Sequence, residues 1–159
     1  MTPLHIMRSL ELKIPPVAIA VLIAIAMWGV SLVSPPLALP FPARMVIAFV
    51  FVSVGASIGI AGIVSFRRAQ TTVNPTKPGS SSTLVCSGIY SVTRNPMYLG
   101  IVLILVGWAA LLSNVLSLSG AFAFVAYMNR FQIAPEEKAL SEIFGTEFTS
   151  YKARVRRWL

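Results

Sequence analysis

Long apolar runs constrain this chain more than any other feature of its sequence. Residues 15–33 and 45–65 carry no charge, and residues 97–112 and 115–131 form a second pair separated only by Ser113-Asn114. A membrane-spanning helix needs about 20 such residues, a length that the second pair reaches with its flanking residues. The pattern predicts an all-α integral membrane protein: one domain over residues 1–159, with four transmembrane helices, the last two as a tight hairpin.

Prolines, arginines and small polar residues mark the ends of these runs. A proline-rich link, residues 35–42, forces a turn between the first two predicted helices. Arg67 and Arg68 end the second run, and residues 67–96 are predicted to be a polar loop. The first run is too long for a secretory signal, so it is expected to remain as a span. In the second, Gly55 and Gly59 form a small-xxx-small pair, which allows close helix packing.

The charge distribution predicts the orientation. Lys and Arg number 13 against 5 Asp and Glu, and with both termini on one side only Arg44 lies on the other. By the positive-inside rule, both termini and the loop 67–96 are then cytoplasmic. The basic excess would face anionic lipid, and no nucleic acid partner is predicted.

Residues 132–159 are predicted to be a cytoplasmic tail. Apolar positions Phe148, Tyr151 and Val155 recur there between basic residues, a pattern typical of an amphipathic helix on a membrane surface. Such a helix would be anchored by Arg154, Arg156, Arg157 and Trp158.

Scarce residue types exclude several kinds of site. Cys86 is the only cysteine and His5 the only histidine, so no disulfide, metal site or Ser-His-Asp triad is predicted. Nothing near Cys86 would lower its pKa, so it is not expected to be a nucleophile. No acidic residue lies between Glu11 and Glu136, and without an intramembrane acid a proton-coupled transporter is disfavoured. Any enzyme chemistry must need little acid–base help from the protein.

A tight hairpin should bring residues 88–100 close to residues 129–137. Arginines and tyrosines would then face the pair Glu136-Glu137 at the membrane surface. Singly, each residue also has an ordinary explanation: Arg94 as a snorkelling arginine, Tyr90 and Tyr98 as interfacial tyrosines, and the acids as a helix start.

The order of these motifs is more specific than any one of them. Gly88-Ile89-Tyr90, Thr93-Arg94-Asn95-Pro96-Met97-Tyr98-Leu99-Gly100, Arg130, Glu136-Glu137 and Phe144-Gly145-Thr146-Glu147-Phe148 follow one another around the hairpin. Over residues 66–159 this arrangement resembles the isoprenylcysteine carboxyl methyltransferase and phospholipid methyltransferase superfamily, including the loop at residues 71–75 that is familiar from its bacterial members.

The resemblance implies a membrane methyltransferase that binds S-adenosylmethionine at the cytoplasmic face. It implies catalytic roles for Arg94 and Arg130. The residues that it implies for cofactor binding are Tyr90, Asn95, Pro96, Tyr98, Leu99, Gly100, Glu136 and Glu137. Asn95 stands where the eukaryotic pattern has histidine, so a role that needs imidazole protonation is in doubt.

Charge and shape suggest what each group would do. Glu136 or Glu137 would pair with the cofactor's α-amino group or ribose hydroxyls, and Arg94 or Arg130 would hold a carboxylate of cofactor or substrate. Gly100 would permit close backbone approach, and the ring of Tyr98 could lie near the sulfonium.

Because the site lies between spans, the acceptor is expected to be an amphiphile, such as an isoprenylcysteine-like carboxylate or a lipid head group. The loop resemblance implies a bacterial inner membrane. The main alternative is a non-catalytic four-helix scaffold or lipid-binding protein, which would tolerate neutralisation of the two glutamates. A small transporter is the third possibility.

Overall fold

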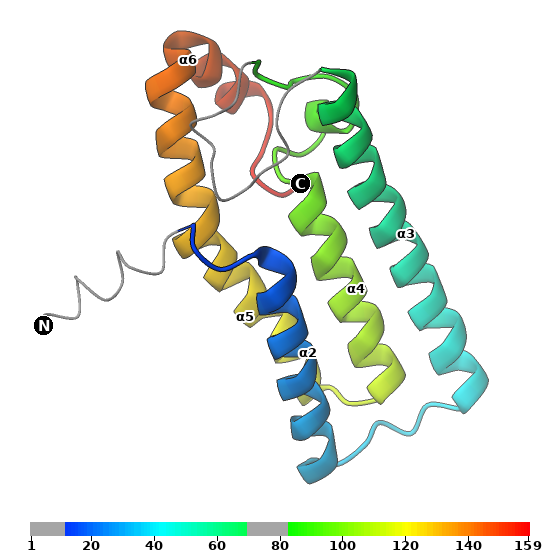
Figure 1. Cartoon of the computed structure of the whole chain (residues 1–159). Helices are drawn as coiled ribbons and strands as arrows, with labels where there is room; N and C mark the ends of the chain where they lie inside the picture. The colour runs from blue at the N-terminus through cyan, green and yellow to red at the C-terminus, as the bar shows by residue number, and fades with distance from the viewer. Residues whose placement is uncertain (1–11, 70–82) are drawn as a thin grey trace, which may run out of the picture.

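The computed structural model describes residues 12–69 and 83–159, and within them every regular element is helical (Figure 1). The predicted all-α class is confirmed for these residues. The elements are α2 (Pro16–Val33), α3 (Phe41–Arg68), η2 (Gly88–Ser91), α4 (Pro96–Leu112), η3 (Leu116–Leu118), α5 (Ser119–Tyr127), η4 (Met128–Ile133) and α6 (Ala134–Arg154).

Two of these helices, α2 and α3, are long and apolar enough to cross a membrane. Prolines open both helices, where a missing backbone N–H costs no helical hydrogen bond. α3 starts at Phe41, four residues before the predicted run and inside the segment expected to be a link. Pro42 therefore lies in the first turn of the helix rather than in the turn that precedes it.

The second pair of runs differs more from the prediction. α4 has 17 residues and ends at Leu112; the next residue, Ser113, adopts the left-handed conformation with φ 51°. The fourth run is not one regular helix: the 3-10 turn η3 and the nine-residue α5 lead into η4, a π-helical turn, and α6 follows without a break. Figure 1 shows α5 and the first part of α6 as one long rod that extends beyond α4. α6 is kinked at Gly145, where φ is 50° and ψ is −117°, and its last residues turn back toward the start of α4.

Close packing of α3 on α4 depends on glycines. A Cβ added to Gly55 would lie 2.5 Å from the carbonyl oxygen of Gly100, and one added to Gly100 would lie 2.5 Å from that of Gly55. Further along, a Cβ at Gly107 would lie 3.1 Å from the carbonyl oxygen of Ala48. The predicted small-residue face is confirmed as a contact between helices, in which the backbones of α3 and α4 approach closely.

Buried polar side chains join the helices at the end of the bundle where α4 connects to α5. The Asn114 amide donates to Ser34 Oγ at 2.7 Å, and Ser117 Oγ donates to the carbonyl of Met27 at 2.8 Å. Both bonds join the α4–α5 connection to α2. Trp108 adds a third link, from its Nε1 to the carbonyl of Ala24 at 3.0 Å.

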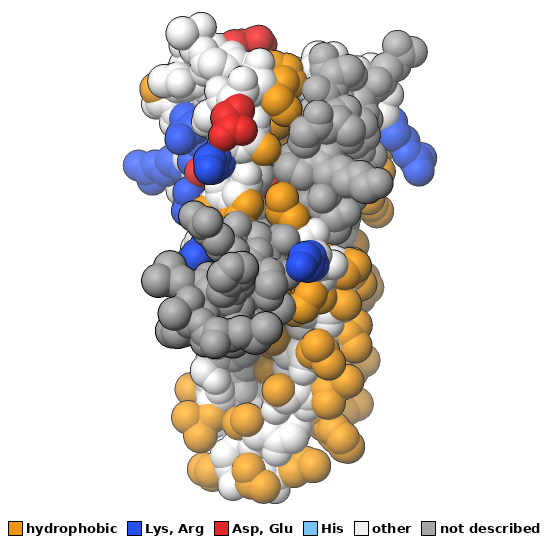
Figure 2. All heavy atoms as spheres, turned by 60° about the vertical axis from the view of Figure 1, so that its left-hand side comes forward, with side chains coloured by type: hydrophobic (Ala, Val, Ile, Leu, Met, Phe, Trp, Pro, Cys, Tyr) orange, Lys and Arg blue, Asp and Glu red, His pale blue; other side chains and the backbone are white. Residues whose placement is uncertain are grey.

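Apolar and charged side chains separate along the molecule. In Figure 2 hydrophobic side chains cover the lower half of the visible face, and the charged groups lie in the upper half. Large apolar side chains such as Leu32, Phe41 and Phe49 are exposed on α2 and α3. A surface of this kind suits lipid rather than water.

The C-terminal segment departs from the predicted amphipathic helix. α6 ends at Arg154, and Val155 is extended, with φ −120° and ψ 131°. Helix is replaced here because the backbone finds other partners: the amide N–H of Arg94 donates to the carbonyl of Arg156 at 3.1 Å. Residues 155–159 therefore turn back beside the start of α4, where the C-terminus lies in Figure 1.

Candidate functional site

The candidate site lies at the polar end of the bundle, where three parts of the chain meet. These are residues 93–98 at the start of α4, residues 129–137 along η4 and the start of α6, and the tail 155–159. The predicted approach of residues 88–100 to residues 129–137 is confirmed by side-chain contacts between them.

Glu136 is partly buried and accepts hydrogen bonds from two buried side chains. Its Oε1 accepts a hydrogen bond from the Tyr98 hydroxyl at 2.6 Å and another from Gln132 Nε2 at 2.8 Å. Both donors are buried, Tyr98 with 5% and Gln132 with 2% of its surface exposed. Burial raises the pKa of Glu136 to about 7, although these two hydrogen bonds lower it. Burial thus favours the protonated form of this carboxyl group.

Glu137 is shared by two arginines. Its Oε1 lies 3.1 Å from Arg94 Nη2, and Arg157 donates to both oxygens, from Nε at 3.1 Å and from Nη2 at 2.6 Å. The side chains of Arg94 and Glu137 are each 12% exposed, and that of Arg157 is 37% exposed. The Arg157 pair has the two-pronged geometry of strong charge-assisted hydrogen bonds.

Two of the hydrogen-bond donor atoms of Arg94 have no acceptor among the described residues. Its Nε and Nη1 atoms are buried and form no hydrogen bond with any described residue. Buried donors without acceptors are destabilising, by about 1–3 kcal/mol or more for a charged group. These atoms are therefore suited to receive an oxygen anion that is not part of the described chain.

The tail is attached to both sides of the site. The carbonyl of Arg157 accepts from Asn95 Nδ2 at 2.9 Å, and the Trp158 indole N–H donates to Asn129 Oδ1 at 3.1 Å. The predicted membrane anchors Arg157 and Trp158 thus lie inside the site, whereas Arg156 is exposed. Sequence reasoning missed Arg157 and Asn129 because their partners are 20 or more residues away in the sequence, and no local pattern marks them.

The other predicted residues are distributed around this cluster. Tyr90 is buried against Phe66, with ring centroids 5.3 Å apart, and Pro96, Leu99 and Gly100 are buried in the first turns of α4. The close backbone approach at Gly100 is to α3. Arg130 has an exposed side chain, whose guanidinium lies 5.4 Å from the centre of the Phe131 ring.

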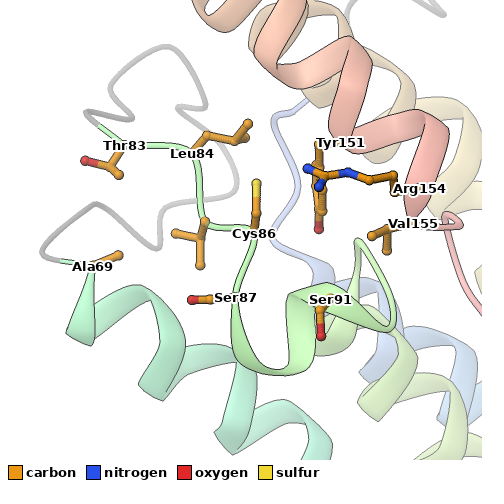
Figure 3. Close-up of a pocket in the computed structure, with 10 residues that line it drawn as sticks. Ala69, Thr83, Leu84, Cys86, Ser87, Ser91, Tyr151, Arg154 and Val155 are labelled. Atoms are coloured by element: carbon orange, nitrogen blue, oxygen red, sulfur yellow. The ribbon is translucent and has the colours of Figure 1, made fainter.

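A cavity of about 560 Å³ lies beside Tyr151 (Figure 3). The Tyr151 hydroxyl donates to the carbonyl of Tyr90 at 2.7 Å, and burial raises the pKa of both phenols. In Figure 3 the wall opposite Tyr151 and Arg154 is formed by Leu84 and Cys86. The complete lining is Ala69, Thr83, Leu84, Val85, Cys86, Ser87, Ser91, Tyr151, Arg154 and Val155.

Residues 83–87 were not predicted to belong to the site. They form no regular element and carry no charge, so nothing in the sequence distinguishes them from an ordinary connection. Burial, and then the nearby Glu147, raises the pKa of the Cys86 thiol, although Arg154 lowers it. This shift agrees with the prediction that Cys86 is not a nucleophile.

Comparison with known proteins identifies the family of this chain. The model of one family, described as phospholipid methyltransferase, matches residues 43–147, which include Arg94, Tyr98 and both glutamates. An uncharacterised protein of Haemophilus influenzae is 48% identical over 63 residues, which are 40% of this chain and all of that protein.

Two curated enzymes also match. The protein-S-isoprenylcysteine O-methyltransferase of Saccharomyces cerevisiae is 41% identical over 83 residues, 50% of this chain and 34% of the enzyme. The protein-S-isoprenylcysteine O-methyltransferase B of Arabidopsis thaliana is 36% identical over 75 residues, 45% of this chain and 36% of the enzyme. This chain thus aligns with about a third of the length of each enzyme. No solved structure matches the chain.

Proposed function

This chain belongs to the phospholipid methyltransferase family, and from that premise we propose that it transfers a methyl group from S-adenosylmethionine to an amphiphilic acceptor at the cytoplasmic membrane face. The observation that carries the proposal is the joining of the two family motifs at the polar end of the bundle. Tyr98 donates to Glu136 at 2.6 Å, and Arg94 lies 3.1 Å from Glu137.

The residues present fit the cofactor chemically. Glu137 offers a carboxylate for an ammonium group, and Arg94 has two buried donors that lack acceptors among the described residues. An amino-acid group, with one charge of each sign, would satisfy both. The neighbouring cavity of about 560 Å³ is within the usual range for ligand pockets, roughly 300–1,000 Å³, and combines apolar walls with serine hydroxyls.

S-adenosylmethionine supplies a methyl group on a sulfonium, which is already an activated electrophile. The protein therefore needs chiefly to position two reactants and exclude water. Tyr98 is buried and donates its hydroxyl to Glu136, and its aromatic ring would suit contact with a cationic sulfur. Gln132 completes the support of Glu136.

The acceptor would approach from the lipid side. Apolar side chains cover α2 and α3, and the charged cluster begins where α4 starts, so an acceptor with its tail in the bilayer would present its head near Arg94. An isoprenylcysteine-like carboxylate and a phospholipid head group both fit this description. We assign four spans to the chain from its apolar runs and place both termini in the cytoplasm from the distribution of its basic residues. The resemblance of its loop to those of bacterial members favours a bacterial inner membrane.

A methyl-transfer assay tests the proposal. Purified protein in nanodiscs would be given labelled S-adenosylmethionine and, in separate reactions, a prenylcysteine analogue or an aminophospholipid. We expect label in the lipid fraction with one of them, and loss of that activity in Glu137→Gln. Glu142→Gln is the matched control, because Glu142 is an exposed glutamate on the same helix. Failure to label either acceptor, or equal activity in both variants, would contradict the proposal.

A further inference from the structure

Arg157 binds Glu137, the carboxylate that the proposed function assigns to the ammonium group of the cofactor. Its guanidinium donates to both oxygens of Glu137, at 3.1 and 2.6 Å, and thus takes the position in which a ligand ammonium would be expected. This inference rests on the proposed function. We propose that Arg157 is an internal ligand: it occupies the ammonium subsite of an amino-acid group, and the segment 155–159 is displaced when that group binds.

The charges around Glu137 favour such an exchange. Arg94 and Arg157 bind the same carboxylate, so their two guanidinium groups lie near each other and repel, and the three side chains together carry a net charge of +1. An incoming amino-acid group would replace the Arg157 cation with its ammonium and would bring a carboxylate as well. That carboxylate has acceptor atoms for Arg94 Nε and Nη1, which are buried without a described partner.

The tail is held by hydrogen bonds around Arg157, by Val155, which is buried against Phe148 and Tyr151, and by Trp158, which packs against the apolar core. Beyond Glu137, Arg157 is held by Asn129 at 3.4 Å and by Asn95 and Thr93 through its carbonyl at 2.9 and 3.4 Å. The segment 155–159 follows α6, which ends at Arg154, so its displacement would leave that helix intact. Arg157 is also three times as exposed as Glu137, 37% against 12%.

Removing the internal ligand should tighten binding of an amino-acid ligand. The apparent affinity of a ligand is reduced by the fraction of protein in which its site is accessible. Calorimetry of the full chain in nanodiscs would compare wild type with Arg157→Gln, using S-adenosylhomocysteine as the probe. We expect an affinity about three- to tenfold higher in Arg157→Gln. Arg156→Gln is the matched control, because it removes an exposed charge from the same segment, and its affinity should equal that of wild type.

A second probe separates displacement from a structural role. 5′-Methylthioadenosine lacks the α-amino and carboxylate groups of the amino-acid part, so its affinity should be the same in wild type and Arg157→Gln. If Arg157 only holds the site together, both probes should bind more weakly to the variant, and that result would overturn the inference. The fluorescence of Trp158 gives an independent readout and is obtained by subtracting the spectrum of Trp158→Phe. It should shift to the red as S-adenosylhomocysteine is added. An unchanged or blue-shifted spectrum would contradict displacement.

The outcome also distinguishes the inference from the proposed function. Binding to wild type that is unchanged or weakened in Arg157→Gln would refute the internal ligand and leave the methyltransferase proposal intact. Binding to neither protein would refute both. Binding to Arg157→Gln alone would be the strongest support for the internal ligand.

Discussion

The two glycines of the small-residue pair on α3 should respond oppositely to alanine. A Cβ at Gly55 would lie 2.5 Å from the Gly100 carbonyl oxygen, a backbone atom that cannot rotate away. A Cβ at Gly59 would meet nothing within 4 Å. The sequence motif treats the two positions alike, so a difference between them would come from the observed packing alone.

The magnitude follows from two opposing effects. Alanine favours a helix over glycine by about 0.8–1.0 kcal/mol, which should stabilise Gly59→Ala. Overpacking typically destabilises by about 1–3 kcal/mol, and the rigid opposing backbone places Gly55→Ala toward the upper end of that range. We therefore expect Gly55→Ala to be about 1–2 kcal/mol less stable than wild type and Gly59→Ala to be up to ~1 kcal/mol more stable.

Unfolding of the two variants in the same detergent measures this difference. At roughly 2–4 °C per kcal/mol for a chain of this size, the melting temperatures should differ by about 2–12 °C, with Gly55→Ala lower. Gly100 lies half a turn beyond Tyr98, so a displaced α4 should also weaken S-adenosylhomocysteine binding in Gly55→Ala. A Gly55→Ala protein as stable as Gly59→Ala would refute the α3–α4 packing described above.

Three further predictions concern other parts of the molecule. Burial raises the pKa of Glu136 from 4.5 to about 7, so between these pH values the folded protein binds more protons than the unfolded chain. The free energy of unfolding should therefore fall as the pH rises from 4.5 to 7. Unfolding curves measured over a pH series should show a flatter dependence for Glu136→Gln. Asn114→Ala leaves buried partners unsatisfied, so it should lower stability by about 1–3 kcal/mol without changing S-adenosylhomocysteine affinity, and a changed affinity would contradict a purely structural role. With the polar end in the cytoplasm, a membrane-impermeant maleimide should label Ser87→Cys, an exposed position, in a Cys86→Ser background in inverted vesicles and not in intact cells. Ala38→Cys in the same background should give the opposite pattern.

The sequence was sufficient to predict what depends on composition and local spacing. Runs of apolar residues predicted the helices, and the short connection at Ser113-Asn114 predicted that residues 88–100 would meet residues 129–137. That meeting is seen in the contact of Tyr98 with Glu136. The glycine spacing on α3 likewise predicted a close helix contact, because backbones approach where side chains are absent.

Features that depend on distant partners could not be predicted in this way. Basic and apolar residues alternate to the end of the chain, which favours a helix locally, yet Arg157 instead finds Glu137 and Asn95. The π-helical turn η4, which precedes Glu136, has no signature in the sequence. Gly55 and Gly59 differ only in what lies opposite them on α4.

The central claim is that the junction of Arg94, Glu136 and Glu137 binds S-adenosylmethionine. Its most direct test is calorimetric titration of the full chain in nanodiscs with S-adenosylhomocysteine, for wild type, Glu137→Gln and Glu142→Gln. Our account predicts saturable binding at one site per chain in wild type and Glu142→Gln, and a loss of at least tenfold in affinity in Glu137→Gln. Absence of binding to wild type, or equal affinity in all three proteins, would contradict it.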